Sequence, residues 1–290
     1  MKLAPILCVV LFALGLGPES SRAAPSPLAA SRFRAWAKAK EPSAGPPAAI
    51  GGYAAGCLSG ANRLALDGEG YAVMRPSRRR YYGHPALKTF VEGLGKDAKA
   101  AKLPLVLVGD LGGPRGGPMI SGHASHQTGL DVDLWYLLSK KRPSAKDRER
   151  WGATNLVRRD GSVNKLWGED QIKLVEMAAS NEAVDRIFVH AALKKNLCGK
   201  FAGAAWLGKL RPWWGHADHF HVRLRCPPED KECTGQEALA LNDGCGPDVD
   251  WWFSAEAKEE GAKKSKAHAG RDFPELPAAC SKLMRDGEEL

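Results

Sequence analysis

Histidines and aspartates gather in two short stretches of this chain. Of its 8 histidines, five fall in SGHASHQTGLDVD (121–133) and WWGHADHFHVRLRC (213–226). Imidazole and carboxylate groups together are donors that suit Zn²⁺. A zinc site with three protein ligands keeps its fourth position for water or substrate, so the pattern predicts metal-assisted hydrolysis. The candidate donors are His123, His126, Asp131, Asp133, His216, His219 and His221.

Both stretches contain a segment with the alternation of a half-buried strand. In HFHVRLRC (219–226) the histidines and arginines fall on one face and the apolar residues on the other. In DVDLWYLL (131–138) the two aspartates share one face, and the apolar residues that alternate with them take the core side. Two such strands side by side would bring both donor sets to one rim of a sheet.

The alternative to a catalytic metal site is a structural one. Structural zinc sites are usually rich in cysteine and closed, whereas this chain has no Cys-x-x-Cys. It also lacks the His-Glu-x-x-His helix of common metalloproteases and the Gly-x-Ser-x-Gly elbow of many serine hydrolases. The sequence therefore favours a catalytic metal site of another type.

The spacing His126-x₆-Asp133, followed far downstream by His219-x-His221, resembles the LAS group of zinc peptidases. More specifically, RGGPMISGHASHQTGLDVDL, RRYYGHPAL and RPWWGHADHFHVRLRCP resemble the penicillin-insensitive murein endopeptidase family. The resemblance runs from about residue 56 to residue 280. It implies a zinc endopeptidase that cuts the D-alanyl–meso-diaminopimelate cross-links of peptidoglycan and is insensitive to β-lactams.

The same resemblance implies roles for individual residues. It makes His126, Asp133 and His221 the ligands of the catalytic zinc and His219 the catalytic histidine. The chemistry agrees, because without a metalloprotease glutamate an imidazole beside the metal must assist proton transfer or stabilise the oxyanion. We expect His216 to contact substrate or to support a neighbouring ligand.

The number of metal ions stays open. His123 and Asp160 match family positions associated with an additional metal, but the family's further histidine is missing in RRDGSVNKLW, where Val163 stands in that region. Asp160 has the alternative interpretation of a turn residue, since it precedes Gly161. Asp131 has an alternative too, which is to orient a ligand histidine without touching the metal.

Three further residues near the clusters have two interpretations each. Trp213 and Trp214 would line the substrate cleft or serve in packing. Arg115 would meet a substrate carboxylate or make a structural hydrogen bond.

The first residues, MKLAPILCVVLFALGLG, combine a basic start with an apolar run too short to span a bilayer comfortably. A small-x-small site ending at Ala23 follows, so residues 1–23 are typical of a cleaved signal peptide, which predicts a periplasmic protein without stable membrane insertion. Of the 7 cysteines, Cys8 lies in this run, and the others are even in number, as disulfides require. Spacing alone leaves their pairing open. The family resemblance implies the pairs Cys57–Cys280, Cys198–Cys245 and Cys226–Cys233.

After the signal, the chain divides by composition. Residues 24–50 are rich in alanine and proline, 51–253 would form the zinc endopeptidase domain, and 254–290 would be a charged linker and a tail tied back by Cys280. We expect a single α+β domain with a mainly antiparallel sheet that carries the zinc site, as LAS enzymes have, and disulfides that staple it.

Element patterns within the domain are clearest at four places. Apolar runs predict buried strands at 103–110 and 186–190, and helical spacing of apolar residues begins after Pro85 and after 168–170.

Net charge is +9, but the basic residues are dispersed and partly mixed with acidic ones. This distribution disfavours nucleic acid as a partner and suits an enzyme that meets an anionic cell wall. Two rival functions remain: a zinc D,D-carboxypeptidase or dipeptidase on the same scaffold, and a non-catalytic periplasmic zinc or cell-wall binding protein, which would not need His219. The oligomeric state is open, with a homodimer as one alternative.

Overall fold

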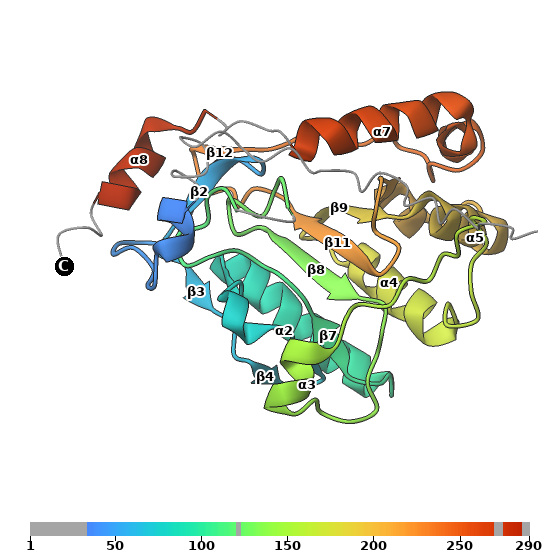
Figure 1. Cartoon of the computed structure of the whole chain (residues 1–290), viewed down its shortest axis with the longest axis horizontal. Helices are drawn as coiled ribbons and strands as arrows, with labels where there is room; N and C mark the ends of the chain where they lie inside the picture. Colours follow the sequence, from blue (N-terminus) through green and yellow to red (C-terminus); the bar gives the residue numbers. More distant parts are fainter. Residues whose placement is uncertain (1–33, 120–122, 270–274, 286–290) are drawn as a thin grey trace, which may run out of the picture.

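The computed structural model describes residues 34–119, 123–269 and 275–285 (Figure 1). The expected signal peptide, residues 1–23, lies outside these ranges. Among the described helices, none has both the length and the apolar character that crossing a bilayer requires.

A seven-stranded sheet, in the order β10-β9-β11-β8-β7-β5-β4, forms the centre of the fold. The buried strands expected at 103–110 and 186–190 are β7 and β9. The strands span Asp67–Gly68 (β4), Tyr71–Val73 (β5), Val106–Val108 (β7), Asp131–Trp135 (β8), Val184–Val189 (β9), Leu210–Pro212 (β10) and His219–Leu224 (β11).

The expectation of a mainly antiparallel sheet is wrong, because the sheets are mixed. Strands β5 and β7 pair in parallel, and so do β9 and β10. Each of these pairs is joined through a helix, and such a crossover returns the chain to the same end of the sheet before the next strand begins. The antiparallel pairs that remain include β8 with β11, which carries the candidate site.

Two smaller sheets and a set of helices surround the central sheet. One small sheet has the order β12-β1-β2, with β1 and β12 parallel, and the other pairs β3 with β6. Their strands are Ala48–Gly52 (β1), Ala55–Ser59 (β2), Asn62–Arg63 (β3), Tyr82–Gly83 (β6) and Cys233–Thr234 (β12). The helices are Pro85–Ala100 (α2), Ala145–Arg150 (α3), Glu169–Ser180 (α4), Ala191–Phe201 (α5), Pro247–Asp250 (α6), Ala255–Ala269 (α7) and Ala278–Arg285 (α8), with 3₁₀ turns Pro76–Arg78 (η1), Ala205–Lys209 (η2) and Trp251–Phe253 (η3).

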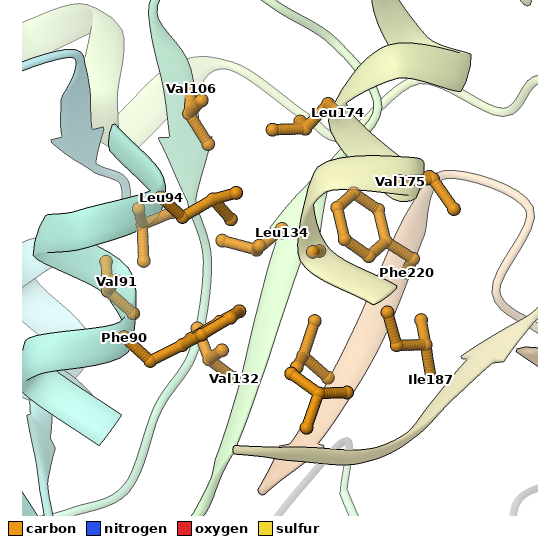
Figure 2. Close-up of a cluster of buried hydrophobic side chains, with 14 of the residues drawn as sticks. Phe90, Val91, Leu94, Val106, Val132, Leu134, Leu174, Val175, Ile187 and Phe220 are labelled. Carbon is orange, nitrogen blue, oxygen red and sulfur yellow. The ribbon is translucent and has the colours of Figure 1, made fainter. Parts of the chain in front are cut away.

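The hydrophobic core lies between the central sheet and helices α2 and α4 (Figure 2). Val132 and Leu134 of β8 point to this side together with Phe220 of β11, as the alternation in the sequence predicts. Phe90 and Leu94 of α2 pack against them. The remaining face of β8 and β11 is thereby left for the polar residues, and the packed core fixes the register of both strands.

Part of the segment expected to be a charged linker and tail, 254–290, forms helix α7. Glu259 pairs with Lys263 and Glu260 with Lys264, each four residues apart on the helix surface, which favours helix over coil. The helix packs through the buried Ala257. Figure 1 shows α7 in orange-red, above β9 and β11.

Three disulfides hold the outer elements to the core: Cys57–Cys280, Cys198–Cys245 and Cys226–Cys233. These are the pairs that the family resemblance implied. Cys57–Cys280 joins β2 to α8 across a sequence separation of 223 residues. Buried Trp36 packs in the same cluster, so the described part of the alanine- and proline-rich segment belongs to the domain.

Candidate metal centre

Strands β8 and β11 place the two donor sets side by side. They pair antiparallel with His221 opposite Asp133, so that the polar residues of both strands share the face away from the core. The expectation that the two segments form neighbouring strands with their donors at one rim is therefore confirmed.

Asp133 is the meeting point of four imidazoles. Its Oδ1 lies 3.3 Å from Nε2 of His126, 3.3 Å from Nδ1 of His221 and 3.7 Å from Nε2 of His219. Its Oδ2 lies 3.4 Å from Nε2 of His123. Although burial opposes ionisation, the surrounding histidines, His126 first, hold the pKa of the Asp133 carboxyl well below its usual range. The carboxylate is thus available as an anionic ligand.

His126 has the surroundings of a metal ligand rather than of a core residue. Its side chain is completely buried, yet neither ring nitrogen has a hydrogen-bond partner, and the same holds for Oδ1 of Asp133. Buried polar atoms without partners are costly, and an ion that binds them removes that cost. His126 also has a positive φ of 67°, a backbone conformation that is uncommon for residues other than glycine.

His123, His126 and Asp133 form a compact donor group: one ligand atom from each lies within 4.8 Å of the other two. His221 has a further feature of a ligand, because its Nε2 is 2.8 Å from Oδ1 of Asp131. With a proton on Nε2 donated to this carboxylate, Nδ1 keeps its lone pair on the side of Asp133. The residues present therefore fit an ion held by nitrogen and oxygen donors.

Asp131 contacts two of the candidate metal ligands, His126 and His221, from behind the donor atoms. Its Oδ2 accepts a hydrogen bond from the backbone N–H of His126, and its Oδ1 accepts from Nε of Arg223 at 2.7 Å as well as from His221. Asp131 is fully buried, and the guanidinium of Arg223 and the ring of His221 outweigh this desolvation and lower the pKa of its carboxyl. The structure thus favours the interpretation that Asp131 orients ligands.

His219 stands at the open side of the centre. Its Nδ1 is 2.6 Å from Oδ1 of Asp218, its Nε2 is turned toward Asp133, and its side chain remains 23% exposed. Burial disfavours the charged ring, but Asp133 and Asp218 overcome it and raise the pKa of His219 to about 9. A histidine oriented by one carboxylate and accessible at its other nitrogen can move protons.

His216 lies against this histidine and remains neutral. Burial, with the neighbouring imidazoles of His219 and His221, lowers the pKa of His216 to about 3. The neutral ring donates from Nδ1 to the carbonyl of Trp214 at 3.0 Å, which leaves Nε2 as an acceptor. Like His126 it has a positive φ, of 55°.

With this geometry established, comparison with known proteins gives a single answer. The model of a family described as "Penicillin-insensitive murein endopeptidase" matches residues 49–285. The chain belongs to this peptidase family. Among its curated relatives, penicillin-insensitive murein endopeptidases of Yersinia enterocolitica and Salmonella paratyphi C are 44% and 42% identical to it, each over 252 residues, covering 86% of this chain and 90% of the relative.

Asp160, the other family position considered for a second ion, behaves differently from the central donors. Its Oδ1 accepts hydrogen bonds from the backbone N–H and the hydroxyl of Ser162, which closes its own exposed turn. Among the described residues, it is not part of the compact donor group.

The structure also bears on the three residues near the clusters that had two interpretations each. Arg115 donates to the backbone carbonyls of Glu41 and Leu283, so its role in the described structure is structural. Trp214 donates from Nε1 to the carbonyl of Ala257 in α7, whereas Trp213 is 42% exposed.

Two carboxylates of this murein endopeptidase family member were missed in the sequence. Asp110 lies two residues after the end of strand β7, and its Oδ2 lies 3.1 Å from Nε2 of His123. Asp218 directly precedes His219, and its Oδ1 lies 2.6 Å from Nδ1 of that histidine. Both stand next to features that were recognised, the end of a buried strand and a histidine cluster, but nothing in the spacing indicates which histidine each would contact.

Proposed function

We propose that this chain is a zinc-dependent endopeptidase that hydrolyses peptide cross-links of peptidoglycan, at the D-alanyl–meso-diaminopimelate amide. The observation that carries the proposal is His126, buried without a hydrogen bond at either ring nitrogen and 3.3 Å from Asp133, the carboxylate that His221 approaches equally closely. The substrate class rests on the names of the relatives.

His126, Asp133 and His221 would hold one zinc ion. Imidazole and carboxylate donors in a set of three match catalytic zinc sites, which keep one position open. A zinc ion held there would polarise the scissile carbonyl and activate water for attack. Nε2 of His123 lies 3.4 Å from Oδ2 of Asp133 but closer, at 3.1 Å, to Oδ2 of Asp110, and we therefore assign His123 a supporting role. We propose no second ion, because Asp160 is engaged in its own turn.

The chain's own contribution to the chemistry is proton transfer at His219. Asp218 holds Nδ1, so Nε2 is the atom that would exchange a proton. A zinc ion bound beside His219 would oppose the protonated ring and lower the pKa of His219. Nε2 would then take a proton from the attacking water and return it to the leaving amine. His216, neutral and with Nε2 free to accept, would hold an N–H group of the substrate beside the scissile bond.

No step of this scheme needs a serine nucleophile, so β-lactams, which acylate such a serine, have no target. Residues 1–23 would direct the chain to the periplasm, where the substrate lies and where disulfides form.

Digestion of purified cross-linked muropeptides, followed by chromatography, tests the proposal. We expect cross-linked dimers to become monomers, with activity lost in a zinc chelator, restored by zinc, and unchanged by penicillin. Release of only terminal D-alanine would indicate a carboxypeptidase instead. Binding of muropeptides with no cleavage in zinc-loaded protein would indicate a binding protein.

A further inference from the structure

A pair of arginines stands immediately behind the metal centre. Nη1 of Arg78 and Nη1 of Arg80 lie 3.0 Å and 2.9 Å from the same oxygen, Oδ2 of Asp110. The same oxygen is 3.1 Å from Nε2 of His123, which in turn is 3.4 Å from Asp133. Two residues, Asp110 and His123, therefore separate these guanidinium groups from the carboxylate of Asp133.

Two guanidinium groups, which stay protonated at any physiological pH, converge on one oxygen of Asp110. A second carboxylate, Glu149, accepts hydrogen bonds from the backbone and hydroxyl of Ser77. These hydrogen bonds and, to a smaller extent, Arg78 and Arg75 lower the pKa of Glu149, so it stays anionic. The arginines are thus held by anionic groups next to the centre.

Arg78 is the member of the pair that a ligand can reach. Its side chain is 38% exposed, against 17% for Arg80 and 6% for Asp110. The guanidinium has five N–H donors in a planar fork, and the contact with Asp110 uses one nitrogen. Its other edge is suited to a carboxylate, which such a fork binds through two parallel hydrogen bonds.

The backbone that presents Arg78 is held in a rare conformation. Turn η1 is flanked by Arg75 and Arg79, both with positive φ, at 52° and 55°. The turn is fastened on both sides: the N–H of Arg75 donates to the carbonyl of Arg148 in α3, and Leu111 donates to the carbonyl of Arg80. Strain of this kind persists where the surrounding structure enforces it, and it is common at ligand sites.

We propose that Arg78 binds a free carboxylate of the peptide substrate, close to the bond that is cut. This rests on the proposed peptidase function and names the group that makes an acidic peptide the preferred substrate. Arg78 is linked to Asp133 through Asp110 and His123, so a carboxylate bound by Arg78 would lie near the scissile amide. Arg80 and Asp110 would hold the Arg78 guanidinium in place.

The test uses zinc-loaded protein and two forms of one cross-linked muropeptide, with its carboxylates free or converted to amides. We measure kcat/KM, and we measure Kd by calorimetry on the His219→Ala background, where turnover is expected to be at least about 10²-fold slower. We expect the unaltered protein to favour the free form about 10- to 100-fold, the usual worth of a hydrogen bond to a charged group. Arg78→Gln should remove this preference, mainly through KM and Kd, and Arg78→Lys should keep part of it.

Arg79→Gln is the matched control, because Arg79 is the next residue along the chain and carries the same charge, but donates to the carbonyl of Lys40 instead of to Asp110. It should keep the preference, and all three variants should keep their zinc and their unfolding temperature. Equal binding of the two forms by the unaltered protein, or a preference that survives in Arg78→Gln, overturns the inference. Binding with the expected preference but no cleavage leaves it standing and refutes the proposed function instead.

Discussion

Buried and half-buried histidines serve two different purposes in this molecule. His84 and His190 each precede a helix, α2 and α5, and their Nδ1 atoms accept hydrogen bonds from the backbone of Ala86 and Ala192, at 3.2 and 3.1 Å. These rings cap helices. His126 is buried more completely than either, and no helix end or carbonyl satisfies its ring nitrogens.

The difference shows that residue type and burial do not identify a metal ligand, whereas an unsatisfied ring beside a carboxylate does. A capping histidine has already used the lone pair with which it would bind an ion. His126 and His221 keep theirs toward Asp133. The contrast makes the capping histidines natural controls for the site.

Removal of a ligand should have the largest effect. We expect His126→Ala, Asp133→Ala and His221→Ala to lose most of the bound zinc and nearly all turnover, because three protein ligands are the minimum of a catalytic zinc site. His84→Asn should keep about one zinc per chain. Metal analysis of the purified variants checks this, and full zinc content in all three ligand variants would refute the assignment.

Removal of the proton carrier comes next. His219→Ala should keep its zinc but lower the turnover of cross-linked muropeptide about 10²- to 10⁴-fold, the usual range for a general acid–base. His190→Asn serves as the control and should cleave at the normal rate. Steady-state kinetics on zinc-loaded proteins decide the matter: a normal rate in His219→Ala would contradict the mechanism.

Loss of the bracing carboxylate should have a smaller effect. Asp131→Asn weakens the contact that fixes the ring of His221, so zinc affinity should fall about 10- to 100-fold. It also leaves the buried Arg223 without its charge partner. Asp185→Asn, which removes the partner of Arg186 on neighbouring β9, is the matched control and should leave zinc affinity unchanged. Competition with a zinc indicator measures both, and equal affinities would contradict the role of Asp131.

The capping histidines should show the smallest effect, and only in acid. Burial lowers the pKa of His190 below its ordinary value of 6.5, so the folded state binds fewer protons than the unfolded state just below that pH. Its contribution to stability is therefore complete above about pH 6.5 and is lost as the pH falls through the lowered value.

His190→Asn keeps a good helix cap, so the free energy of unfolding at pH 8 should change by less than about 1 kcal/mol. Between pH 8 and pH 5 the variant should lose less stability than the unaltered protein. Urea unfolding in chelator, which removes the contribution of bound metal, gives both numbers. Identical losses in the two proteins would show that the ring of His190 does not titrate on unfolding.

Alternation in the sequence was enough to predict the pairing of β8 with β11, because a strand with one polar and one apolar face has a single way to lie on a core. The parallel pairs were not predictable in this way, since alternation carries no information on strand direction. The composition of helix α7 suits a linker equally well, so composition did not predict the helix. The spacing of four residues between Glu259 and Lys263 and between Glu260 and Lys264 is the feature that favours a helix over a linker.

Within the site, the sequence identified the ligand candidates but not what each one touches. His126, Asp133 and His221 stand out by type and by family pattern. The contacts of Asp110 and Asp218 depend on side-chain positions after folding, and Arg115, considered for a substrate carboxylate, lies against backbone carbonyls while Arg78 lies behind the centre. Long-range contacts of single polar residues leave no periodic trace in a sequence.

The bond between Cys57 and Cys280 has a consequence for how the molecule is completed. Because the bond spans 223 residues, nearly the whole domain must exist before it can close. A chain that ends before residue 280 keeps Cys57 as an unpaired thiol. The small hydrophobic cluster that contains Trp36 and Ile50 then also loses helix α8, which packs against it. A truncated chain therefore differs from the full-length chain by the free thiol of Cys57, and a thiol-reactive reagent would distinguish the two.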